Sequence, residues 1–161
     1  MKLASGKGGF FDYYKQLNYG FGTDGAASSN TLNPVEQARL FGLMGKYQER
    51  NSAAYTATEI WQHLMASHQA FPFGSGRLKE GAPADLVIWD LYQPDTFPFY
   101  SPISAILYSS NSQNVKYTMV AGEFLKYNGK LKIDTKTLMQ EAIRLQKALL
   151  ERGKGKAQVA Y

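Results

Sequence analysis

The chain has 161 residues, of which 44% are hydrophobic and 19% are charged, and its formal net charge is +5. These values are typical of one folded domain, with or without a small appendage, and they exclude an intrinsically disordered chain. The sequence contains no cysteine, which excludes disulfide bonds, thiolate metal sites and a cysteine nucleophile.

Several basic residues lie near the C-terminus, but no aromatic or basic groove pattern accompanies them, so we expect no nucleic-acid partner. The N-terminal residues Met1–Ala4 run into glycines and do not begin an apolar leader segment. No apolar run reaches the length of a membrane span. We therefore expect a soluble, cytoplasmic protein without a membrane partner.

The segment Tyr19–Asn30 places a single acidic side chain, Asp24, between Gly22 and Gly25. The aromatic residues before it predict a strand around Phe21, so that Asp24 would project from a strand end. Ligand and metal chemistry gathers at that position in α/β proteins. An Asp between glycines is more often a turn residue, and the spacing alone leaves both interpretations open.

Two helices with N-terminal capping motifs are predicted next, over Asn33–Glu49 and Thr56–Gln69. The second carries both histidines of the chain, His63 and His68. Five helical steps separate their directions by about 140°, so they cannot chelate one ion from one helix face. The first helix is expected to pack through a broad apolar face. Its members are Val35, Ala38, Leu40, Phe41, Leu43, Met44 and Tyr47.

After a break at Phe71–Gly76, the pattern favours strands. The run Asp85–Leu91 is typical of a buried strand, and residues 104–108 fit either a strand or a short helix. Strands are predicted over Val115–Ala121 and Phe124–Tyr127, followed by a hairpin turn at Asn128–Gly129.

A last helix is predicted from a cap at Asp134 to about Arg152. Gly153 is expected to stop it in a left-handed conformation. The helix has an apolar face, and we expect this face to pack on the predicted strands.

Four segments carry a family resemblance. Gly22–Asn30 closely resembles the last-strand motif of the amidohydrolase superfamily, in the branch of chlorohydrolases and methylthioadenosine/S-adenosylhomocysteine deaminases. Met1–Gly6 is similar to the segment before that strand, Leu78–Asp90 to the return from the barrel to a small β domain, and Val120–Phe124 to its closing hairpin. The resemblance covers nearly the whole chain but only the C-terminal part of such an enzyme.

The resemblance implies an α+β fold with two parts. Residues 1–74 would be a remnant of the C-terminal part of a (β/α)₈ barrel, with its last strand and helices. Residues 75–161 would be a small β domain with a C-terminal helix. A chain of this kind is a truncated enzyme, one subunit of a split enzyme, or a fragment.

The family binds one divalent metal ion, zinc or iron, through a His-x-His pair, a later His and the last-strand Asp. The resemblance assigns Asp24 as that metal ligand and proton acceptor, in hydrolytic attack on a C–N or C–Cl bond of a heteroaromatic substrate. No His-x-His motif is present, so we expect a metal site only if a partner supplies the histidines, and no catalysis by the isolated chain.

Two kinds of function and partner remain open. One is a hydrolase segment that works with a complementary amidohydrolase chain. The other is a non-catalytic, oligomeric binding or interaction module, most simply a homodimer. No other cofactor-binding residue is predicted.

Overall fold

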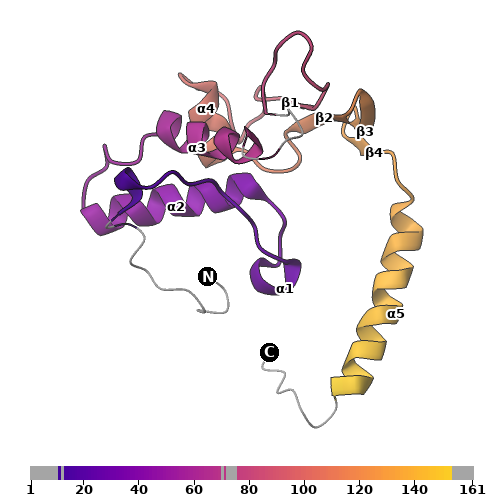
Figure 1. Cartoon of the computed structure of the whole chain (residues 1–161). Coiled ribbons are helices and arrows are strands. Elements are labelled where there is room, and N and C mark those ends of the chain that lie inside the picture. The colour runs from indigo at the N-terminus through magenta and orange to yellow at the C-terminus, as the bar shows by residue number, and fades with distance from the viewer. Residues whose placement is uncertain (1–10, 12, 70, 72–75, 154–161) are drawn as a thin grey trace.

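In the computed structural model of the chain, the described residues are 11, 13–69, 71 and 76–153 (Figure 1). The fold mixes helices and strands, as expected for the α+β class. Its helices are η2 (Tyr14–Gln16, 3₁₀), α1 (Ala26–Ser29), α2 (Pro34–Glu49), α3 (Ala57–Gln69), α4 (Pro102–Ser104), η3 (Ala105–Ser109, π) and α5 (Thr135–Gly153). Its strands are β1 (Leu86–Trp89), β2 (Val115–Val120), β3 (Glu123–Tyr127) and β4 (Lys130–Leu131).

Helices α2 and α3 begin where their caps are predicted. Asn33 Oδ1 accepts hydrogen bonds from the backbone amides of Val35 and Glu36, at 3.1 and 3.3 Å. Thr56 and Glu59 form a reciprocal capping box, because the amide of each bonds to the side chain of the other. The capping motif at Asn33 also predicts a hydrogen bond from the Asn33 amide to the Glu36 carboxylate. This detail is wrong, because the Glu36 carboxylate instead accepts the Thr31 hydroxyl at 2.7 Å.

The main core lies where α2, α3 and η3 meet. Five buried residues form this core: Ala38, Tyr55, Ile60, Leu64 and Leu107. Leu107 comes from the second half of the chain, so η3 shares a core with the helices of the first half. Residues 104–108, for which strand and helix were both open, are thus helical and packed.

The predicted packing face of α2 is wrong in part. The helix buries its small residues Ala38, Gly42 and Gly45. This happens because small residues admit large neighbours: a Cβ on Gly45 would lie 2.6 Å from the Tyr55 ring. The large side chains expected in the core are exposed to solvent instead. They are Leu40, Leu43, Met44 and Tyr47.

The four strands form one antiparallel sheet in the order β1-β2-β3-β4. The hairpin predicted at Asn128–Gly129 is confirmed, with positive φ angles of 45° and 80° at its two central residues. The burial predicted for the first strand is wrong, since Val87 and Ile88 are 48% and 47% exposed. Strand β1 is an edge strand, and no described element covers these side chains.

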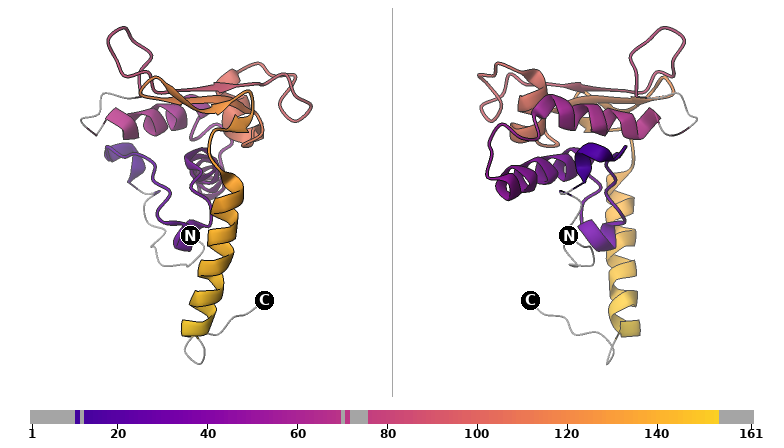
Figure 2. Two further views of the ribbon diagram at one scale, coloured as in Figure 1. Left: turned by 90° about the vertical axis from the view of Figure 1, so that its right-hand side faces the viewer. Right: turned by 60° about the vertical axis from the view of Figure 1, so that its left-hand side comes forward.

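Helix α5 does not pack on the sheet, contrary to prediction. It begins as expected after Asp134, whose Oδ1 accepts the Thr137 amide at 3.1 Å. None of its residues is buried; it projects away from the sheet in every view, and Figure 1 shows it apart from the other helices (Figures 1 and 2). Gly153 is its last residue and is helical, so it is not a left-handed stop.

Among the described residues, no helix combines the length and the apolar character that a membrane span requires.

Candidate functional site

The segment that leads to Asp24 is extended, but it is not a strand, so the strand predicted around Phe21 is wrong. A strand needs a neighbour for its backbone groups, and the described chain offers it none. Helix α3 takes that place. The Phe21 amide donates to Ser67 Oγ at 2.7 Å, and the Tyr19 carbonyl oxygen lies 3.1 Å from His63 Nδ1.

Two side chains of α3 therefore hold this backbone. The Ser67 hydroxyl in turn donates a hydrogen bond to the His63 carbonyl oxygen at 3.1 Å. The His63 ring also stacks on the Tyr19 ring, with centroids 3.8 Å apart. Because a carbonyl oxygen can only accept, Nδ1 of His63 carries a proton in this contact. Partial burial raises the pKa of the Tyr19 hydroxyl to about 12.

Gly20 is required by this close approach. A Cβ at Gly20 would lie 2.4 Å from Ser67 Oγ, so the hydroxyl would have to move and lose the Phe21 amide. We expect Gly20→Ala to lower the free energy of unfolding by about 1–3 kcal/mol. Gly22→Ala is the matched control, because nothing lies within 4 Å of the added atom. Denaturant unfolding of both variants checks this, and equal stabilities would contradict the assigned contact.

Asp24 lies just before α1 with its carboxylate exposed to solvent. Its φ angle of 57° is left-handed, a conformation that Asp and Asn adopt more readily than other side chains. Its Oδ1 accepts the Gly25 amide at 2.6 Å. That bond, followed by one from the Ser28 hydroxyl, lowers the pKa of Asp24, so the carboxylate stays ionised at lower pH than an ordinary Asp.

An ionised, exposed carboxylate can serve as one ligand of a divalent metal ion. A catalytic zinc site normally has three protein ligands, and no three His, Cys, Asp or Glu side chains gather for one within the described ranges. His63 is engaged with the Tyr19 backbone, and His68 is exposed on the same helix. The described residues therefore do not fit a resident metal by themselves: Asp24 offers one ligand and the others must come from elsewhere.

A hollow of about 590 Å³ lies beside the backbone that precedes Asp24. It is bounded on one side by residues 18–22 and on the other by Ala66, Ser67 and Phe71. The hollow thus lies between part of the extended segment and the C-terminal end of α3. Asp24 itself does not line the hollow, which ends at Gly22.

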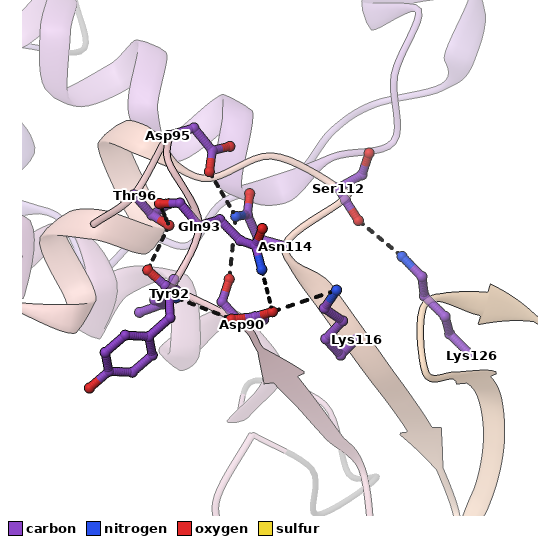
Figure 3. A network of polar contacts seen from close by, with 10 residues as sticks. Asp90, Tyr92, Gln93, Asp95, Thr96, Ser112, Asn114, Lys116 and Lys126 are labelled. Atoms are coloured by element: carbon purple, nitrogen blue, oxygen red, sulfur yellow. Dashed lines mark hydrogen bonds and ion pairs between the residues drawn. The ribbon is translucent and has the colours of Figure 1, made fainter. Parts of the chain in front are cut away.

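A polar network joins the loop after β1 to the turn before β2 (Figure 3). Asn114, which is 1% exposed, donates to Asp95 at 3.2 Å and to the Asp90 carbonyl at 3.3 Å. Asp90 accepts from Gln93 at 2.6 Å, which lowers the Asp90 pKa, and lies 3.5 Å from the Lys116 ammonium. The sequence analysis missed this network. The polar groups of these residues are hydrogen-bonded or ion-paired to one another. The network therefore holds the loop in place and is not a binding site.

The sequence model of the Amidohydrolase family matches residues 12–125 of the chain. A 5-methylthioadenosine/S-adenosylhomocysteine deaminase of Caldicellulosiruptor saccharolyticus is 36% identical over 155 residues, which is 94% of this chain and 36% of that protein. A 5'-deoxyadenosine deaminase of Methanopyrus kandleri is 36% identical over 148 residues, covering 88% of this chain and 34% of that protein.

Two solved structures are also similar. One is an adenosine deaminase from Xanthomonas campestris with bound zinc, at a TM-score of 0.81 and 27% identity over 91% of this chain and 35% of that one. The other is the atrazine chlorohydrolase of Arthrobacter aurescens TC1 complexed with zinc, at a TM-score of 0.73 and 23% identity. The match covers 84% of this chain and 31% of that one, and at this identity it shows a similarity of fold alone. The chain spans about a third of the length of the proteins that it matches.

Proposed function

The chain belongs to the amidohydrolase family, and from this premise we propose that it is the Asp24-bearing part of a metal-dependent hydrolase. The deaminases among its relatives support a hydrolytic attack on a C–N bond of a heteroaromatic substrate, and the proposal includes the C–Cl bond that the family resemblance implies. In this proposal residues 1–74 belong to the C-terminal part of a barrel, and residues 75–161 form a small β domain with its C-terminal helix. The protein works in the cytoplasm.

The observation that carries the proposal is the state of Asp24. Its carboxylate is exposed to solvent, it accepts a hydrogen bond from the Gly25 amide, and this bond lowers its pKa so that it stays ionised. With the partner in place, Asp24 would be one ligand of the metal ion and would accept a proton from the attacking water. The histidine ligands are supplied by a complementary amidohydrolase segment, since this chain contains only His63 and His68.

A zinc or iron ion bound there would supply Lewis-acid activation of water, and zinc is present in two of the similar structures. The contribution of this chain is to position Asp24. His63 and Ser67 fix the backbone at Tyr19 and Phe21, a few residues before the carboxylate. The left-handed conformation at Asp24 then directs its side chain out to solvent, where a partner can reach it.

Activity assays test the proposal. The isolated chain, given zinc or iron, should not turn over adenosine-type or triazine substrates. The same chain co-expressed with a histidine-bearing amidohydrolase segment should do so. Turnover by the isolated chain that Asp24→Asn abolishes would contradict the requirement for a partner, and no turnover by the assembled pair would contradict the proposed activity.

A second candidate is a non-catalytic oligomeric module, which the exposed apolar faces of α2 and α5 favour. In this case we expect the isolated chain to form a homodimer, because a two-fold symmetric interface buries the same apolar face of both copies. Sedimentation equilibrium at micromolar concentration checks this. A single species at the 18.0 kDa mass of one chain would contradict it.

A further inference from the structure

Helix α5 is the longest helix of the structure, and the rest of the described chain buries none of its residues. It has 19 residues. On a helical wheel of about 100° per residue, its apolar side chains fill an arc of about 160°, opposite Gln140, Arg144 and Ala148. The exposed members of this arc are Leu138, Met139, Ile143, Leu145, Leu149 and Leu150.

A helix with such a face is marginal when it stands alone in water, since most helical stability in proteins comes from packing the apolar face. An apolar arc this wide suits a surface with two or more contacting elements better than the narrow seam of a two-helix coiled coil. The face therefore indicates a docking surface, and the question is what occupies it.

The comparisons identify the occupant. The match to the Caldicellulosiruptor deaminase leaves 6% of this chain uncovered, about ten residues, which is fewer than the 19 of α5. The match to the Xanthomonas structure leaves 9%, about 14 residues, so part of α5 is superposed there as well. At least part of α5 is thus aligned with chains about three times longer, and the unmatched two thirds of those chains are the candidate for the element that covers its apolar face.

The placement of α5 points to the same partner. In both views of Figure 2, α5 and α1 lie on the same side of the sheet. Asp24 precedes α1 by two residues, so a segment docked on α5 is placed on the same side of the sheet as Asp24. From these observations we infer that the apolar face of α5 docks the histidine-bearing amidohydrolase segment and holds it against Asp24. This inference rests on the proposed function and names the surface through which its partner binds.

Co-purification tests the inference. The probe is the part of the Caldicellulosiruptor deaminase that this chain does not match, affinity-tagged and co-expressed with the full chain. The unmodified chain should co-purify with it at equal stoichiometry. Leu138→Glu/Leu149→Glu, which places two charges on the apolar face, should lower the recovered chain about tenfold or more. The matched control is Gln140→Glu/Ala148→Glu, which adds the same charge on the opposite face and should co-purify normally.

Because the rest of the described chain buries no residue of α5, the thermal unfolding of the body should be unchanged in both double variants. Equal recovery of the two double variants, or no recovery with the unmodified chain, would overturn the inference. A chain that is dimeric alone and becomes monomeric only in Leu138→Glu/Leu149→Glu would make a second copy the occupant and would also overturn it. Asp24→Asn should co-purify normally, so a pair that assembles through α5 but has no activity would contradict the proposed function and leave the docking surface intact.

Discussion

Replacing Asp24 with asparagine lowers turnover by the assembled, metal-loaded pair about a thousandfold or more, because a lost metal ligand removes several kcal/mol of transition-state stabilisation. Asparagine is the substitution that tests the negative charge of Asp24 with the least other change. It keeps the size of the side chain and tolerates the φ angle of 57°, so the backbone at α1 is preserved. Steady-state kinetics on the purified pair measures the effect.

The control for Asp24 is Glu80→Gln, which removes one negative charge from an exposed residue in the loop before β1. This variant should retain full activity. If Asp24→Asn also retained activity while the pair stayed assembled, Asp24 would have no role as a ligand or proton acceptor.

The second large effect concerns the core. Leu107→Ala should lower the free energy of unfolding by about 2–5 kcal/mol, because Leu107 is 0% exposed and its removal leaves a cavity among α2, α3 and η3. The same change at Leu149, which is 63% exposed on α5, should alter stability by less than about 0.5 kcal/mol. Chemical denaturation of the two variants measures both values.

If Leu149→Ala lowered the free energy of unfolding of the isolated chain as much as Leu107→Ala, α5 would pack on the chain itself. This result would remove the basis for treating the α5 face as a docking surface. A negligible loss at Leu107 would instead place the core elsewhere.

The elements that the sequence predicted correctly are those fixed by local chemistry. The cap at Asn33, the box at Thr56 and the Asn128–Gly129 turn each specify their geometry within a few residues. The wrong predictions depended on distant neighbours. The strand around Phe21 and the packing of α5 both presuppose surfaces that the described chain does not provide.

The candidate site divides in the same way. Asp24 is predicted as a site residue from the resemblance of Gly22–Asn30 to the family motif, and its role stays a prediction. The roles of His63 and Ser67 were missed, since both depend on a segment more than 40 residues away. Their spacing of four residues on one helix was the available signal, because it places both side chains on the same face. The sequence does not show that this face meets the backbone at Gly20.

The zinc content of the protein, measured by elemental analysis after dialysis, tests the central claim most directly: that Asp24 is one ligand of a site completed by a partner. The isolated chain should retain less than about 0.1 equivalent of zinc, because a single carboxylate cannot hold the ion against dialysis. The pair should retain about one equivalent, and Asp24→Asn should lose it while the pair stays assembled. Stoichiometric zinc or iron in the isolated chain would contradict the account.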